Sequence, residues 1–218
     1  MATIQIIDNI RLNRKGLQTK DSNNQWVNMH KQQGDLDGAC SIYSLVMAML
    51  CQGMIGKDDI EIYRSLDRRT AKGKFLYHFF YEQGLVQNGY NYTALAREIN
   101  EQPFGVHAIH KRPKTNDDRI KTVGYFINNN IPVIISTEFD DGAHALLTIG
   151  IETNDDDIIT KIFCLDPSAP APKVSLWNGF IDVSKEGNSE YPFYYITDKE
   201  YYKVTLNDML IIEHEKID

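Results

Sequence analysis

Residues 34–51 read G-D-L-D-G-A-C-S-I-Y-S-L-V-M-A-M-L-C, and this stretch decides what kind of fold the chain can adopt. An Asp/Gly-rich turn gives way abruptly to an apolar run, which is the pattern of a helix start. The run is apolar on nearly all sides, so the helix is expected to lie buried at the centre of a domain. Cys40 stands where the turn ends and the helix begins.

The pattern on either side of this helix predicts an α+β fold. Residues 3–7 predict a short strand and residues 13–36 a polar loop. Further helices are predicted over residues 58–66, 74–82, 92–100 and 116–128. Strands are predicted over residues 133–138, 143–152, 159–166, 191–197, 201–206 and 209–213. We therefore expect a single domain, residues 1–218, with a helical half of about 1–130 and an antiparallel-sheet half of about 131–218.

The composition is that of a soluble globular protein. Of the 218 residues, 42% are hydrophobic and 24% are charged, and the formal net charge is −7. The acidic balance argues against nucleic acid as a partner, because phosphate binding needs a basic surface. No apolar run suits a signal sequence or a membrane span, so we expect no membrane insertion. A cytoplasmic protein is expected, or one delivered into another cell as an effector.

The cysteine count excludes a fully paired disulfide framework. Cys40, Cys51 and Cys164 also lack the spacing of a zinc site. His107 and His110 have no partner at a metal-binding spacing. We therefore expect no metal and no cofactor, with Cys51 and Cys164 acting as packed thiols.

Cys40 is the candidate nucleophile. A thiol at a helix start lies at the positive end of the helix dipole, which favours the reactive thiolate. The backbone N–H groups there can bind a developing oxyanion, and Gly38 and Ala39 leave room for a substrate carbonyl. Buried cysteines often only pack, so Cys40 by itself does not establish catalysis.

A histidine and an aspartate follow at suggestive places. His144 begins an apolar strand in D-D-G-A-H-A-L-L-T-I-G, and Asp166 ends the next strand in F-C-L-D-P. If these strands are antiparallel neighbours, Asp166 is expected to accept the Nδ1–H of His144 and stabilise the imidazolium. Taken alone, His144 could be a core histidine and Asp166 a turn initiator. The order Cys, His, Asp makes the joint interpretation stronger.

These motifs resemble those of the papain-like cysteine peptidases, and most of all the bacterial double-glycine leader peptidases and their relatives. The matching pieces are Q-Q-G-D-L-D-G-A-C, G-A-H-A-L-L-T-I-G and C-L-D-P, spread over residues 32–167. The resemblance implies a nucleophile at Cys40, a general base at His144, an orienting Asp166 and an oxyanion-hole glutamine at Gln33. Gln33 lies seven residues before Cys40, where the family pattern has six.

Several neighbouring residues are candidates for substrate binding. Asp141 and Gly142 precede His144, and an acidic turn there could attract a basic substrate residue or simply be solvated. Trp177 beside Asn178 is similar to the papain arrangement, in which an Asn orients the His and a Trp shields it. Asp166 is preferred as the third member because it closes the neighbouring strand, and Trp177 could line the cleft or the core.

We therefore predict a hydrolase that cuts peptide or isopeptide bonds of a protein or peptide substrate through an acyl-thioester. Three alternatives stay open. The same triad could serve an effector that deamidates or acylates a protein. The D-G-A-C string also resembles the D-G-x-C turn of ovarian-tumour-type deubiquitinases. Finally, the fold could be an inactive papain-like binding module.

Overall fold

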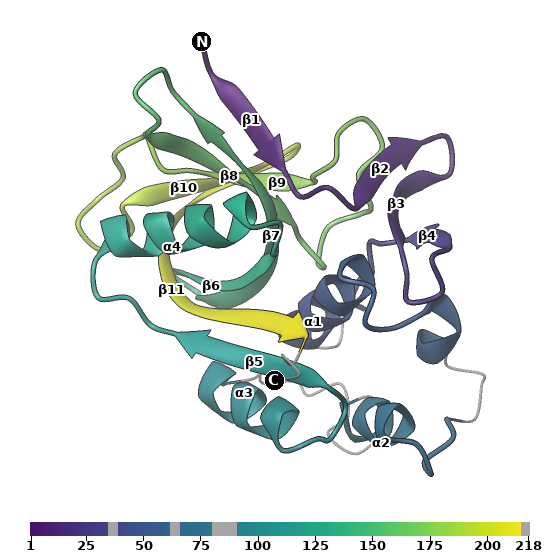
Figure 1. Ribbon diagram of the computed structural model, residues 1–218. Helices are drawn as coiled ribbons and strands as arrows, with labels where there is room; N and C mark the ends of the chain where they lie inside the picture. Colours follow the sequence, from purple (N-terminus) through teal and green to yellow (C-terminus); the bar gives the residue numbers. More distant parts are fainter. Residues whose placement is uncertain (35–38, 62–65, 80–90, 215–218) are drawn as a thin grey trace.

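The computed structural model describes residues 1–34, 39–61, 66–79 and 91–214. It is a mixed α/β fold whose largest feature is an eight-stranded antiparallel sheet (Figure 1). The strands of that sheet are β1 (Thr3–Ile6), β5 (Val106–Lys111), β6 (Val133–Phe139), β7 (Gly142–Thr153), β8 (Ile159–Leu165), β9 (Gly179–Asp182), β10 (Phe193–Thr197) and β11 (Tyr201–His214).

Six of these strands close into a barrel. They pair in the order β7-β6-β11-β10-β9-β8, and β8 pairs back to β7. β1 adds to one edge of the barrel against β7, and β5 pairs with β11. The antiparallel sheet that the sequence predicts is thus closed on itself, which leaves fewer unpaired strand edges.

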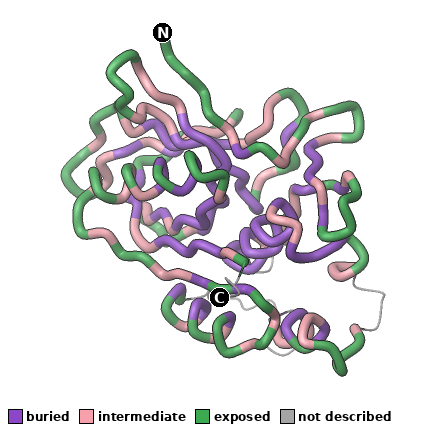
Figure 2. The backbone as a smooth tube through the Cα atoms, in the orientation of Figure 1, coloured by how far each residue is buried: buried purple, intermediate pink, exposed green. Residues whose placement is uncertain are grey.

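Two of the helices lie against the outside of the barrel (Figure 1). α1 (Cys40–Cys51) contacts β7, β6 and β11, and α4 (Asn116–Asn128) lies across another side (Figure 1). α3 (Tyr92–Asn100) packs on β5, and α2 (Ala71–Tyr77) follows a short 3-10 helix, Lys57–Ile60. In α1 every residue but Tyr43 is buried, which confirms the predicted buried helix. Figure 2 shows this helix mostly in the colour of buried residues.

The amino-terminal part differs from the prediction. Within residues 13–36, predicted as loop, the structure has β3 (Gly16–Lys20) and β4 (Trp26–Asn28), which form a small sheet with β2 (Ile10–Asn13). These strands are too short for a clear alternating pattern, and they are stabilised by pairing and by the burial of Leu17 and Val27 in the core. The predicted helix over 58–66 is a 3-10 turn in its described part, and residues 62–65 and 80–82 of the predicted helices lie outside the described residues.

Candidate active site

Cys40 is the first residue of α1. Its N-cap is Ala39, which has no side-chain oxygen to accept a bond from the first turn, unlike Asn91 and Thr115 at the starts of α3 and α4. The Cys40 sulfur accepts a hydrogen bond from the backbone N–H of Ala145 in β7, with 3.4 Å between nitrogen and sulfur. The helix start is therefore held directly against the strand that carries His144.

The surroundings of Cys40 favour its thiolate. Burial by itself would raise the pKa of this thiol, since only 8% of the residue is exposed. A hydrogen bond and charge interaction with His144, together with the backbone N–H groups of Ala145 and Ser41, outweigh burial and lower the pKa. Cys40 is thus set up as a nucleophile by its neighbours.

His144 lies between Cys40 and Asp166. Its Nε2 is 2.7 Å from Asp166 Oδ1. β7 and β8 are antiparallel neighbours, as predicted, with Leu147 opposite Leu165, so both side chains come to one end of the barrel. The expectation that Nδ1 faces Asp166 is wrong. Because Nε2 is bound to Asp166, the hydrogen bond between His144 and Cys40 is left to the other ring nitrogen, Nδ1.

The protonated form of His144 is strongly favoured. Burial by itself would lower the pKa, because the side chain is only 17% exposed. The hydrogen bond to Asp166 and the interactions with Cys40 outweigh burial and raise the pKa to about 10. The result is a thiolate–imidazolium pair stabilised from both sides.

The Asp166 carboxylate is held by four donors. Oδ1 accepts from His144, from the N–H of Ser168 at 2.7 Å and from its Oγ at 2.6 Å, and Oδ2 accepts from the Tyr195 hydroxyl at 2.7 Å. Burial tends to raise the pKa of Asp166, but the bonds to His144, Ser168 and Tyr195 bring it well below its ordinary value. The carboxylate is therefore ionised and its orientation is defined.

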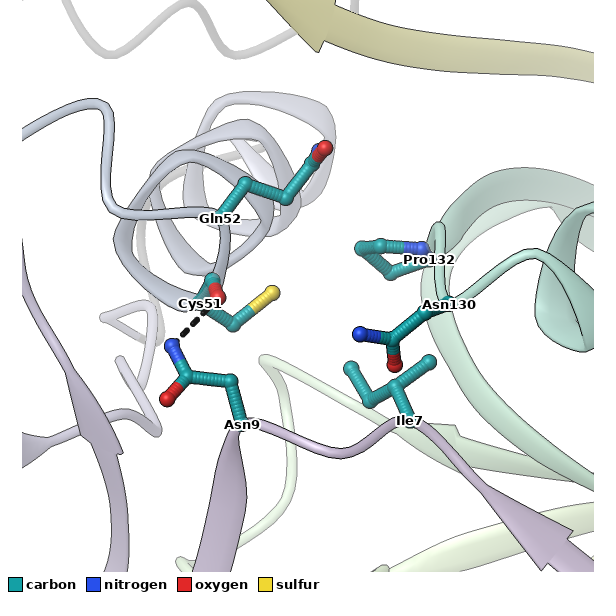
Figure 3. A pocket seen from close by; sticks show the side chains of 6 residues that line it. All are labelled: Ile7, Asn9, Cys51, Gln52, Asn130 and Pro132. Atoms are coloured by element: carbon teal, nitrogen blue, oxygen red, sulfur yellow. Dashed lines mark hydrogen bonds between the residues drawn. The ribbon is translucent and has the colours of Figure 1, made fainter.

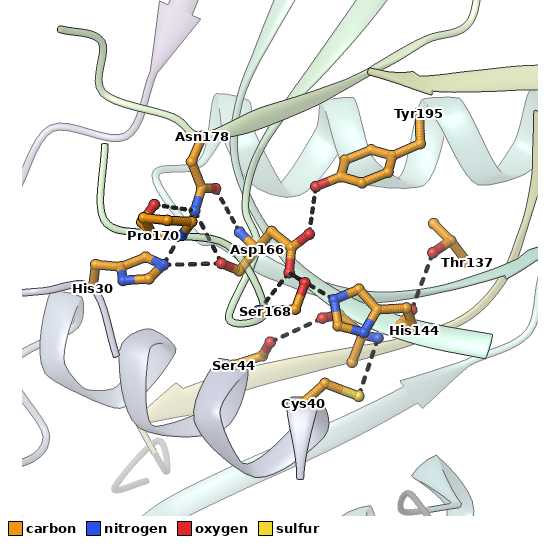
Figure 4. Close-up of polar contacts among 11 residues, drawn as sticks. His30, Cys40, Ser44, Thr137, His144, Asp166, Ser168, Pro170, Asn178 and Tyr195 are labelled. Atoms are coloured by element: carbon orange, nitrogen blue, oxygen red, sulfur yellow. Dashed lines mark hydrogen bonds and ion pairs between the residues drawn. The ribbon is translucent and has the colours of Figure 1, made fainter. Parts of the chain in front are cut away.

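Asn178 holds the backbone of Asp166 rather than the imidazole of His144 (Figure 4). Its Oδ1 accepts from Asp166 N at 2.7 Å, and its Nδ2 donates to Asp166 O at 3.0 Å and to Pro170 O at 3.1 Å. His30 Nε2 donates to the same Asp166 carbonyl at 2.9 Å. Asn178 and His30 thus fix the main chain just after β8.

Gln33 has its backbone beside this site. Its N–H donates to Pro167 O at 2.8 Å, one residue after Asp166. Its side-chain Oε1 is buried and has no hydrogen-bond partner among the described residues. Ala39 is buried at the helix start, and Gly38 lies outside the described residues.

The other predicted substrate-binding residues are divided between surface and packing. Asp141 and Gly142 are exposed at the turn between β6 and β7, and a Cβ on Gly142 would meet no atom within 4 Å. Trp177 stacks on Phe163 of β8, with ring centroids 4.0 Å apart. That contact packs Trp177 against the barrel, so its role in a cleft stays a prediction.

The opposite end of α1 has a hollow of about 290 Å³ (Figure 3). Its lining residues are Ile7, Asn9, Cys51, Gln52, Asn130 and Pro132. Burial raises the pKa of Cys51 to about 12, so the thiol there stays protonated. The hollow therefore has no activated nucleophile, and it is separate from the site at Cys40.

Comparisons with known proteins leave the family open. No protein-family model and no curated protein match the chain. Among solved structures, the crystal structure of UfSP from C. elegans matches with a TM-score of 0.46 and 12% sequence identity. The match covers 100% of this chain and 36% of that protein, so the chain spans about a third of its length. At that score the likeness does not establish a common fold.

The described part of the chain has no group of three or more His, Cys, Asp and Glu side chains that could hold a metal ion. It also has no helix long and apolar enough to cross a membrane.

The sequence did not predict the contacts of Ser168 and Tyr195 with Asp166. Ser168 had a local signal, because an Asp commonly bonds the N–H two residues on. Tyr195 had none, being 29 residues away along the chain.

Proposed function

We propose that the protein is a cysteine hydrolase of peptide or isopeptide bonds, with Cys40 as nucleophile, His144 as general base and acid, and Asp166 as the residue that orients His144. One observation carries the proposal. Side chains from α1, from β7 and from the residue after β8 form a continuous hydrogen-bonded chain from thiol to imidazole to carboxylate. The pKa of the thiol is lowered and that of the imidazole raised, as a thiolate–imidazolium pair requires.

The reaction would run in two stages. The Cys40 thiolate attacks the carbonyl carbon, and the His144 imidazolium gives its proton to the departing amine as the C–N bond breaks. The acyl group is then bound to Cys40 as a thioester. Neutral His144 takes a proton from a water molecule, whose oxygen attacks the thioester, and the carboxylic acid leaves as Cys40 is regenerated.

The oxyanion formed in each stage needs donors. The backbone N–H groups in the first turn of α1 point toward the end where Cys40 lies, and the helix dipole favours negative charge there. We assign the second donor to the side-chain amide of Gln33, whose backbone is tied to Pro167 next to the site. Gly38 and Ala39 lack bulk at the approach to Cys40, and Asp141, Gly142 and Trp177 are proposed to contact the substrate.

The Cys40→Ala variant tests the proposal. With the wild type, iodoacetamide should label Cys40, and a proteome-derived peptide mixture, together with peptides joined through a lysine side chain, should be cut. Both signals should vanish in Cys40→Ala, because no other thiol is activated. The matched controls are Cys51→Ala and Cys164→Ala, which should keep both. Turnover that persists in Cys40→Ala would disprove the assignment.

The same mass spectra separate the chemical outcomes. A new peptide terminus reports hydrolysis of the chain, whereas a gain of about one mass unit on an intact substrate reports deamidation through the same thioester.

A further inference from the structure

We propose that Tyr195 is a positioning residue of this site: its hydroxyl holds the Asp166 carboxylate in the rotation that aims Oδ1 at His144. The inference rests on the proposed function, since it concerns the same Cys40–His144–Asp166 chain. It adds a residue from β10, a strand that carries none of the three.

The bond geometry supports the role. The Tyr195 hydroxyl donates to Asp166 Oδ2 at 2.7 Å, while His144 is bound to the other oxygen, Oδ1, also at 2.7 Å. Oδ1 also accepts two hydrogen bonds from Ser168, whereas Tyr195 is the one donor to Oδ2 among the described residues. A carboxylate held at both oxygens cannot turn about its bond to Cβ without breaking a buried hydrogen bond. Tyr195 is 6% exposed, so water cannot readily replace it.

The main chain of Asp166 is held separately. Asn178 bonds both the N–H and the carbonyl of Asp166, and His30 bonds the same carbonyl. Loss of the Tyr195 hydroxyl would therefore leave the loop in place and the bonds of Oδ1 available, and would leave only the buried Oδ2 without a donor. The carboxylate could then satisfy Oδ2 only by turning, which moves Oδ1 away from His144. This separation makes the positioning role testable by a single-atom change.

Gly179 gives the tyrosine its path to Asp166. A Cβ at Gly179, in β9, would collide with the Tyr195 hydroxyl and lie 2.7 and 2.8 Å from two ring carbons. A glycine inside a strand commonly marks such a close approach. Because Gly179 of β9 has no side chain, the Tyr195 side chain of the neighbouring strand β10 has the space to reach Asp166.

Two physical effects of the hydroxyl predict opposite results when it is removed. If it positions the carboxylate, its loss lets Asp166 rotate, the imidazolium loses its acceptor, and the Cys40 thiolate then forms only at higher pH. If the hydroxyl only disperses the negative charge of the carboxylate, its loss raises the pKa of His144. The imidazolium is then more stable, and the Cys40 thiolate forms at lower pH. The direction of the shift decides between them.

The experiment measures the rate of Cys40 alkylation by iodoacetamide against pH, in a Cys51→Ala/Cys164→Ala background. For Tyr195→Phe we expect the pH of half-maximal rate to rise by about one unit, and kcat on a cleaved peptide to fall by roughly tenfold or more with little change in KM. The matched control is Tyr194→Phe, which removes the hydroxyl of the adjacent residue on the opposite face of β10 and should shift neither.

A downward shift, or no shift, in Tyr195→Phe would overturn the positioning role, and a lowered Tm without a pH shift would show that Tyr195 only packs. Gly179→Ala should shift the half-point upward like Tyr195→Phe, and the two changes together should shift it less than their sum. If the wild type reached its half-maximal alkylation rate at the pH typical of an unperturbed thiol, the result would count against the proposed function instead. That measurement depends on neither the Tyr195 variant nor a substrate.

Discussion

At the scale of single residues, the cysteine side chain behaves in two ways in this protein. Burial raises the pKa of Cys51 to about 12. Burial, and to a lesser extent the negative charge of Asp166, raises the pKa of Cys164 well above its ordinary value. Cys40 is buried too, yet its pKa is lowered, because His144 and two backbone N–H groups stabilise the thiolate. Reactivity is thus set by the partner and not by exposure.

The pH dependence of turnover follows from these directions. The active pair exists above the lowered pKa of Cys40 and below the pKa of His144, about 10. We expect kcat/KM to rise as pH passes the thiol pKa and to fall near pH 10. In Asp166→Asn the falling limb should move to lower pH, since the strongest interaction that raises the His144 pKa is lost. An unmoved limb in a pH–rate profile would contradict this.

At the scale of elements, β7 is the strand on which the site depends. It pairs with β1, β6 and β8, it carries His144, and the backbone N–H of Ala145 contacts Cys40. At Gly150, opposite Ile6 of β1, the strand has no side chain. A Cβ there would lie 2.6 Å from the Gln5 carbonyl oxygen.

Gly150→Ala is therefore expected to lower the free energy of unfolding by about 1–3 kcal/mol, measured by urea denaturation, because a backbone oxygen can yield only if β1 moves. Gly124→Ala is the matched control. A Cβ at Gly124, inside α4, would meet chiefly the tip of the flexible Ile159 side chain. Its stability should stay within about 1 kcal/mol of the wild type, helped by the helix propensity of alanine. Equal losses in both variants would refute the close-packing explanation.

At the scale of the whole molecule, barrel closure brings together residues far apart in sequence. β1 and β5, from the first 130 residues, join the sheet formed by residues 133–214, so the two parts of the chain interleave. The closed ring places β7, β8 and β10 around one end, where α1 begins. The core buries Cys51 and Cys164 at 4% and 0% exposure.

This arrangement predicts how the thiols respond to folding. All three thiols are buried in the fold and only Cys40 is activated, so one thiol of the folded protein should react fast with dithionitrobenzoate. In guanidinium all three should react. The fast thiol should disappear in Cys40→Ala and persist in Cys51→Ala. Rapid modification of two or three thiols in the folded state would contradict the burial described above.

The sequence alone was sufficient for the elements that carry strong local signals. Helices over 92–100 and 116–128 match α3 and α4, whose caps Asn91 and Thr115 are local features. The strands β6, β7 and β8 were found because they are continuous apolar runs. β9 was missed and β11 was predicted as two strands, since a short strand and a bulge at residues 206–209 are evident only from their pairing.

By itself, the sequence determined which residues stand at the start of the buried helix and at the ends of two strands, because capping, apolar runs and turns are properties of neighbouring residues. Tertiary structure alone decided which nitrogen of His144 faces Asp166, that Asn178 holds a backbone, and that Tyr195 reaches the carboxylate. These contacts join residues 12 to 29 positions apart, and only barrel closure brings them within hydrogen-bonding distance.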